Sequence, residues 1–242
     1  MVLDSGGYGA VTINQAVSLE APDGIYAGIT ASSGDAITVA AGVNDVVVLR
    51  GLTLTGTSAA GNGINVVTAA TVHVEHCTIR GFSAGNGILA TESVLLQQLY
   101  VEDSEIEECN KAVNATASTL SFVWIDRCRF EGGEGEGTGL LLEGPSDGSS
   151  LTVSISESRF TGWHDGIEVG DTVFLTVDRC VLRDFSIDIS ALGTRESTLT
   201  ITNSVVPNSF AGVELGGHVS ACSLGNNFIA HVIGTLNQCP LQ

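Results

Sequence analysis

Hydrophobic and polar residues alternate along the chain in short blocks that recur. The ten residues from Val123, VWIDRCRFEG, form one such block, and others begin at residues 47, 72, 99, 153, 175, 199 and 222. Alternation with a period of two is typical of a β-strand with one buried face. Positions one and three of each block are mostly Val, Ile or Leu, and position eight is again apolar, so the phase changes between them. Each block therefore predicts two short strands separated by a turn.

A second pattern follows most of these blocks and contains one further apolar run. It begins with GNGI at residues 61 and 85 and has related forms at residues 110, 137, 164 and 210. Three short strands in each unit of 22 to 30 residues, without helical periodicity, predict a solenoid of parallel coils. We expect about nine coils in a single domain over residues 1–242. Residues 1–45 form an irregular first coil or N-terminal edge in this interpretation, residues 46–230 the regular coils, and residues 231–242 a C-terminal tail.

Four segments carry a resemblance to a known family: GGYGAVTI, VVVLRGLTLTG, GNGI followed by VHVEHCTIRGF, and SLGNNFIA. They are similar to segments of bacterial right-handed parallel β-helix repeat proteins of the pectate-lyase-like superfamily, in a group without an assigned function. The resemblance covers nearly the whole chain and implies an all-β fold, a single-stranded right-handed parallel β-helix. The superfamily includes polysaccharide lyases, glycoside hydrolases, esterases and epimerases, so carbohydrate chemistry is implied by analogy of fold alone.

Three of the six cysteines recur at position six of the blocks. They are Cys77, Cys128 and Cys180, and they alternate with serines in the intervening blocks. Position six points to the interior after the predicted turn, and cysteines two coils apart are separated by about 10 Å. That separation is too long for a disulfide, so we expect three free thiols in the core. Arg127 and Arg129 flank Cys128 but point outward by the same alternation, which argues against a reactive thiolate.

The other three cysteines are less well placed by the repeat. Cys222 falls at an inward position in this alignment, and the sequence leaves the state of Cys109, Cys222 and Cys239 open. Because no two cysteines have the CxxC spacing, we do not expect a zinc site.

Two outward positions bring chemically distinctive residues together on adjacent coils. Position two holds aromatic rings, and position four holds carboxylates: His73, Tyr100 and Trp124 stand beside Glu75, Glu102 and Asp126. Stacked carboxylates repel one another unless they are solvated, compensated from elsewhere or bound to a cation. We therefore expect a ligand site formed by the three rings, for carbohydrate, and the three carboxylates are the candidate ligands for Ca²⁺. The alternative is a solvated acidic face on which the rings only cover the sheet.

The segment GWHDG at residues 162–166 is a second candidate. We expect Trp163, His164 and Asp165 to project from a turn, where a histidine beside an aspartate is suited to act as a general base. The alternative is that the two side chains diverge, as neighbouring residues on a turn usually do.

Charge excludes several classes of partner. The chain has 27 acidic and nine basic residues, for a formal net charge of −18, so polyanions such as nucleic acid are repelled. No apolar run approaches the roughly 18 residues of a membrane span, so we do not expect membrane insertion. The first residues do not resemble a signal peptide. The compartment stays open between the cytoplasm and a processed or truncated part of a secreted bacterial protein.

These observations favour a non-catalytic β-helix module, structural or carbohydrate-binding, without a cofactor other than the Ca²⁺ considered above. The alternative is a polysaccharide-active lyase, hydrolase or epimerase that uses Glu75, Glu102 and Asp126, or His164 and Asp165. The motifs of polygalacturonase-like hydrolases are missing, and Lys111 is the only lysine. Neither end of the chain resembles a capping helix, so we also expect a homo-oligomer formed by end-to-end association of β-helices.

Overall fold

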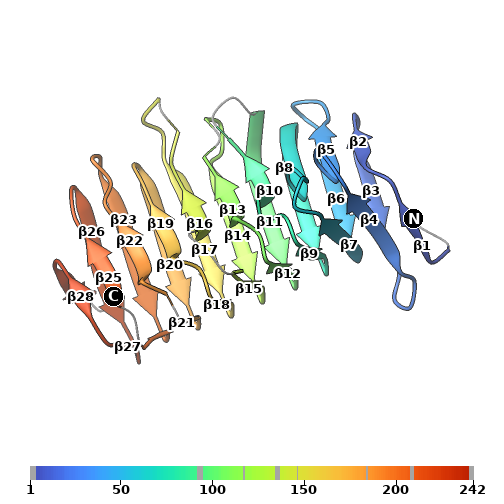
Figure 1. Ribbon diagram of the computed structural model, residues 1–242. Helices are drawn as coiled ribbons and strands as arrows, with labels where there is room; N and C mark the ends of the chain where they lie inside the picture. Colours follow the sequence, from blue (N-terminus) through green and yellow to red (C-terminus); the bar gives the residue numbers. More distant parts are fainter. Residues whose placement is uncertain are drawn as a thin grey trace.

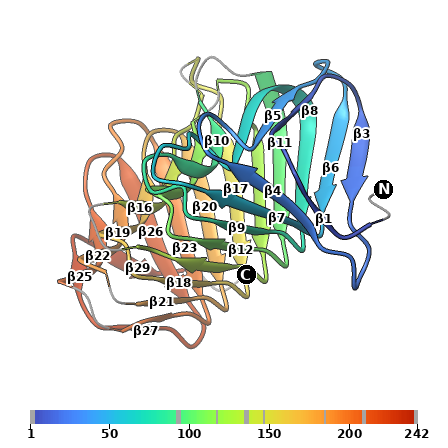
Figure 2. The ribbon, with the colours of Figure 1, turned by 45° about the vertical axis from the view of Figure 1, so that its right-hand side comes forward.

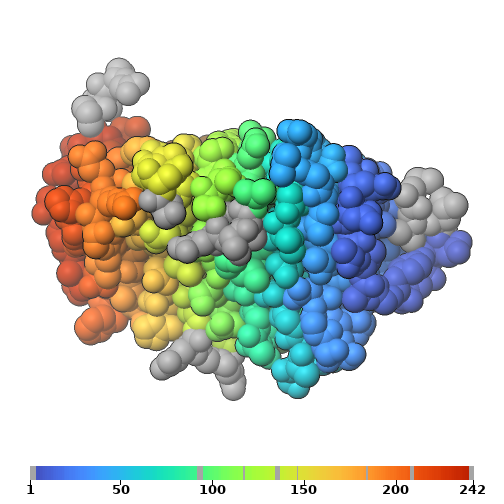
Figure 3. All heavy atoms as spheres, turned by 90° about the horizontal axis from the view of Figure 1, so that it is seen from above, coloured from blue at the N-terminus to red at the C-terminus, as the bar shows by residue number. Residues whose placement is uncertain are grey.

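The computed structural model describes residues 4–91, 95–116, 118–133, 137–145, 147–183, 185–207 and 210–239. These residues form a parallel β-solenoid of about nine coils, which stack into an elongated column (Figures 1 and 3). Every pair of neighbouring strands is parallel, and no helix occurs in the described ranges, let alone one long and apolar enough to cross a membrane. The prediction of an all-β parallel β-helix is confirmed.

Each coil contributes strands to three faces (Figures 1 and 2). The first face is a ten-stranded sheet of β1 (Gly6–Tyr8), β4 (Ala27–Ala31), β7 (Leu52–Gly56), β9 (Thr78–Arg80), β12 (Glu105–Glu107), β15 (Arg129–Glu131), β18 (Arg159–Thr161), β21 (Val181–Arg183), β24 (Val205–Val206) and β27 (Phe228–Ile229). The second consists of β2 (Val11–Ile13), β5 (Ile37–Ala40), the first part of β8 (Ile64–Glu75), β10 (Asn86–Ala90), β13 (Lys111–Ala115), β16 (Thr138–Leu142), β19 (Asp165–Val169), β22 (Ile187–Ala191), β25 (Ala211–Leu215) and β28 (Val232–Ile233). The third consists of β3 (Val17–Glu20), β6 (Val46–Arg50), the rest of β8, β11 (Leu95–Glu102), β14 (Phe122–Asp126), β17 (Leu151–Ser156), β20 (Val173–Asp178), β23 (Ser197–Thr202), β26 (Val219–Leu224) and β29 (Leu236–Gln238).

The strand register confirms the repeat for the blocks that begin at residues 47 to 199, which follow one another in one column of the third face. The last block begins at residue 221, not 222, because Leu199 pairs with Ala221. The turn before Asn227 contains one extra residue, which displaced the alignment. Cys222 therefore pairs with Thr200 at an outward position, and its predicted inward placement is wrong.

The interior is filled by columns of apolar side chains that run along the whole solenoid. One column on the first face consists of Leu54, Ile79, Ile106, Phe130, Phe160, Leu182 and Val206, all fully buried. The rings of Phe130 and Phe160 stack with centroids 4.5 Å apart and planes inclined by 12°. Parallel coils put the same residue of each repeat above its counterpart, so period-two alternation in the sequence becomes a continuous core.

Position six forms an internal ladder in which cysteine and serine alternate. The Oγ of Ser158 accepts a hydrogen bond from the backbone N–H of Cys128 at 3.0 Å and donates one to the carbonyl of Ser156 at 2.7 Å. Ser104 and Ser204 accept in the same way from Cys77 and Cys180. Each serine thus satisfies a backbone donor of the preceding coil that would otherwise be buried without a partner.

Replacement of Ser158 by alanine should lower the free energy of unfolding by about 1–3 kcal/mol, because the N–H of Cys128 loses its acceptor inside the core. Replacement of Cys128 by serine should change it by less than about 1 kcal/mol, because a hydroxyl can donate to the carbonyls that the thiol already faces. Urea denaturation followed by circular dichroism measures both. Ser154→Ala, on the outer surface of β17, the strand that precedes Ser158, is the control. Equal losses at residues 154 and 158 would contradict the role of the ladder.

Position five forms the corner before this ladder and adopts a left-handed backbone conformation. Arg127, for example, has φ of 50° and Asp103 has φ of 48°. Their side chains meet on the outside, where Nε and Nη2 of Arg127 each donate to an Asp103 carboxylate oxygen at 2.8 Å and lower the pKa of that carboxyl. Arg127 also pairs with Asp126, whereas Glu157 on the following coil binds Arg179. Arg127 and Arg179 therefore form ion pairs on the outer surface of the column.

Candidate functional site

A row of aromatic rings lies on the outside of the third face, across β8, β11 and β14. The register places Tyr100 between His73 and Trp124, as the repeat predicted. Phe122, two residues before Trp124 on β14, joins the row from the neighbouring outward column. We define these four side chains, His73, Tyr100, Phe122 and Trp124, as the aromatic row.

The rings of the aromatic row follow one another without a gap. His73 and Tyr100 stack with centroids 4.6 Å apart and planes inclined by only 8°. Phe122 lies 5.7 Å from Tyr100 and 6.2 Å from Trp124, again between centroids. All four side chains are half-buried, so one side of each packs on the sheet while the rest stays accessible. The row is a shallow platform on a rigid surface.

The three carboxylates beside the row are present in one column, but two of them are already compensated. Nε of Arg50 donates to Glu75 at 2.8 Å. Asp126 is nearly buried and accepts a hydrogen bond from Ser156 Oγ at 2.5 Å as well as pairing with Arg127. Only Glu102, between them, makes no ion pair among the described residues. The stacked charge that motivated a cation site is thus largely balanced by arginines.

The three carboxylates do not have the arrangement of a metal site. In the parts of the chain that the structure describes, no three His, Cys, Asp or Glu side chains come together closely enough to hold a metal ion. The placement of Glu75, Glu102 and Asp126 as Ca²⁺ ligands remains a prediction from the sequence.

The second candidate lies on another face, at the start of β13, β16 and β19. His164 Nδ1 is 3.2 Å from Asp165 Oδ1, so these two side chains do meet. They line a shallow pocket of about 330 Å³ together with Asn110, Lys111 and Thr138. The contact is not a hydrogen bond, however, because Asp165 Oδ1 is buried without a hydrogen-bond partner among the described residues. The carboxylate therefore does not orient the imidazole as general-base chemistry requires.

Trp163 does not project from this turn, contrary to the prediction. It is 4% exposed, and its indole Nε1 donates to the carbonyl of Cys109 at 3.0 Å. The apolar area of the ring favours burial, and the distant carbonyl satisfies its one polar group. Trp163 is therefore a core residue and does not line the pocket.

The thiols of the core are buried and stay protonated at neutral pH. Cys77, Cys109, Cys128 and Cys180 are all buried and free, which confirms the prediction for the position-six cysteines. Burial raises the pKa of the Cys128 thiol to about 12 despite the two flanking arginines. It raises the pKa of Cys77 to about 11 and those of Cys109 and Cys180 to about 12. Thiolate chemistry at neutral pH is disfavoured at each of them.

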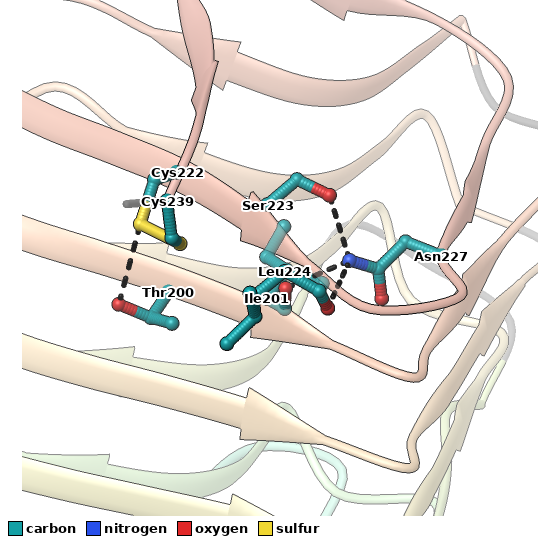
Figure 4. The surroundings of a disulfide bond; sticks show 7 residues. All are labelled: Thr200, Ile201, Cys222, Ser223, Leu224, Asn227 and Cys239. Atoms are coloured by element: carbon teal, nitrogen blue, oxygen red, sulfur yellow. Dashed lines mark hydrogen bonds between the residues drawn. A yellow bond between two sulfur atoms is a disulfide. The ribbon is translucent and has the colours of Figure 1, made fainter. Parts of the chain in front are cut away.

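The remaining two cysteines, Cys222 and Cys239, form a disulfide. It connects β26, where Cys222 pairs with Thr200 of the preceding coil, to the residue that follows β29 (Figure 4). The sequence left this pairing open because residues 231–242 were interpreted as a tail, whereas β28 and β29 continue the coil.

Comparisons with known proteins identify the fold and nothing more specific. A search of the curated proteins and of the solved structures found no match to the chain. A family model described as the right handed beta helix region matches residues 35–229, which is most of the sequence. The match agrees with the parallel coils and with the repeat on which they are built. The chain therefore belongs to the right-handed β-helix family.

Proposed function

We propose that the protein is a non-catalytic β-helix module that binds carbohydrate through the aromatic row. The observation that supports this most directly is the unbroken succession of four rings at centroid distances of 4.6–6.2 Å on an open strand face. A sugar ring presents an apolar C–H face that packs on an aromatic ring, while its hydroxyls remain at the edge. A row of rings along the column fits several consecutive units of a glycan chain.

Polar groups next to the row suit the hydroxyls of a neutral glycan. The hydroxyl of Tyr100 lies 3.4 Å from Oε1 of Gln98. The half-buried Glu102 follows on the same strand. Amide and carboxylate oxygens accept hydrogen bonds from sugar hydroxyls. An anionic polysaccharide would instead meet a chain with a net charge of −18, so we expect weak or no binding of polyuronates.

Titration calorimetry against a panel of soluble neutral polysaccharides, with a polyuronate for comparison, tests the proposal. Replacement of Trp124 or Tyr100 by alanine should weaken binding of the preferred neutral glycan about 10-fold each, because truncation of an aromatic anchor costs more than about 1 kcal/mol. Phe174→Ala is the matched control. Phe174 is an exposed ring in the same outward column as Phe122, two coils away from the row.

Three results would contradict the proposal. One is the absence of binding across the panel, and another is equal loss of affinity for the variants at residues 124 and 174. The third is release of shortened glycan during the titration, which would favour the polysaccharide-active enzyme. Reducing-end and unsaturated-product assays on the same samples detect such cleavage, and His164→Ala would then show whether the pocket at β19 is responsible.

A further inference from the structure

We propose that the protein associates head to tail, with the last coil of one copy stacked on the first coil of a second copy. The two surfaces that would meet are the end coils, whose open strand edges lie at opposite ends of the column (Figure 1). β1 and β27 are the outermost strands of the ten-stranded sheet. β2 and β3 lie outermost beside β1, and β28 and β29 beside β27, so the described strands leave one open edge on each of the three faces at each end.

The apolar core columns reach both edges and are partly exposed there. At the first coil, Tyr8 and Val17 are 43% and 37% exposed, although each pairs with an inward residue of the next coil. At the last coil, Ile229, Val232 and Leu236 continue buried columns but are themselves only half-buried. These three line a hollow of about 370 Å³ at that end. Each of these side chains lacks the neighbour that an additional coil would provide.

Charge is sparse in both edge coils. Residues 5–19 and residues 215–239 contain no Asp, Glu, Lys or Arg, although the chain holds 36 such residues (27 acidic plus nine basic). Natural proteins commonly protect open strand edges with charged side chains, and the described edge strands carry only one, Glu20 at the end of β3, which lies near Arg50 of the next coil. Two copies that each carry a net charge of −18 also repel one another least where their ends carry few charges.

A second copy of this chain is the occupant that fits both edges. β3 runs parallel to β6, and β29 runs parallel to β26, so the strands at the two edges have the same direction and belong to the same columns. A first coil placed on a last coil therefore continues all three faces. The Cys222–Cys239 disulfide holds β29 against β26, which keeps this edge in place before a partner arrives (Figure 4). Contacts of this heterologous kind do not close and build linear assemblies.

Sedimentation velocity and light scattering on the oxidised full chain test the proposal. The mean mass of the wild type should rise with protein concentration. Val17→Lys places a charge on the first edge and Leu236→Lys on the last, so each variant alone should stay monomeric. An equimolar mixture of the two variants retains one intact first edge and one intact last edge per pair. It should therefore form a dimer and nothing larger.

Val67→Lys is the control, because Val67 is 43% exposed on β8, which belongs to neither end coil, and this variant should associate like the wild type. Circular dichroism checks folding of each variant. If Leu236→Lys does not fold, Gln238→Pro replaces it. The backbone N–H of Cys239 donates to the carbonyl of Ser223 in the preceding coil. Because successive N–H groups of a strand point to opposite sides, the N–H of Gln238 points out of the stack, and a proline there removes a donor that a second copy would need. A wild type that is monomeric at every concentration, or a mixture of folded variants that yields no dimer, overturns the proposal.

Discussion

Replacement of Phe160 by alanine is expected to lower the free energy of unfolding by about 3–5 kcal/mol, the usual cost of removing a buried phenylalanine ring. Phe160 is fully buried, and its ring stacks on that of Phe130 in the preceding coil. The substitution would leave a cavity that cannot collapse, because the strands on either side are fixed by hydrogen bonds to their own neighbours. Denaturant titration of both chains, followed by circular dichroism, measures the loss.

The same variant should also reveal how local the stability of the column is. Each coil contacts only its neighbours, so hydrogen exchange should accelerate most in β15, β18 and β21 and least in the end coils. Phe174→Ala removes an exposed ring and is expected to cost less than about 1 kcal/mol. A loss below 1 kcal/mol for residue 160, or uniform acceleration of exchange along the chain, would contradict this account of the core.

The core columns matter for the proposed binding surface because they fix the spacing of the aromatic row. Tyr100 and Trp124 stand on strands whose neighbouring residues Val101 and Ile125 are fully buried in adjacent coils. The rings cannot shift along the column without displacing these buried side chains. A surface of this kind binds without a large loss of conformational entropy, which suits weak individual contacts repeated along a polymer.

The sequence predicted the repeated part of the structure well, since one pattern determines both strand alternation and the stacking of coils. The columns of His73, Tyr100 and Trp124, and of the three acidic residues beside them, follow from counting along the repeat. Phe122 was missed because the blocks were taken to begin one residue later. Extending each block upstream by one position would have found it.

Features that depend on contacts between distant or irregular segments were not predictable in the same way. Trp163 is buried because its indole reaches a carbonyl 54 residues away in sequence, and no local pattern contains that information. Cys222 was assigned to the wrong side because one extra residue in a turn shifts the alternation. The ion pair of Arg50 with Glu75 lies within a predicted column, but only side-chain geometry shows which charges meet.

The GNG motif provides the last prediction: Gly85→Ala should lower the free energy of unfolding by about 3 kcal/mol. Gly85 does not have the left-handed backbone that favours glycine, so an alanine has no conformational difficulty there. Space is the obstacle, because a Cβ on Gly85 would lie 1.8 Å from the carbonyl oxygen of Gly61 in the preceding coil. Neither backbone can yield without breaking the hydrogen bonds that join the coils, and overpacking of this kind is strongly destabilising.

Between the stacked glycines, asparagine side chains hold the same coils together. Oδ1 of Asn62 accepts hydrogen bonds from the backbone N–H of Asn86 at 2.9 Å and from its side-chain amide at 2.8 Å. Separation of the coils by an added methyl group would break both bonds, which is why we expect a cost at the upper end of the range for overpacking. Gly9→Ala is the control, since a Cβ there has no atom within 4 Å. If thermal and denaturant unfolding show equal stability for the variants at residues 85 and 9, the motif marks a turn preference and not a contact between coils.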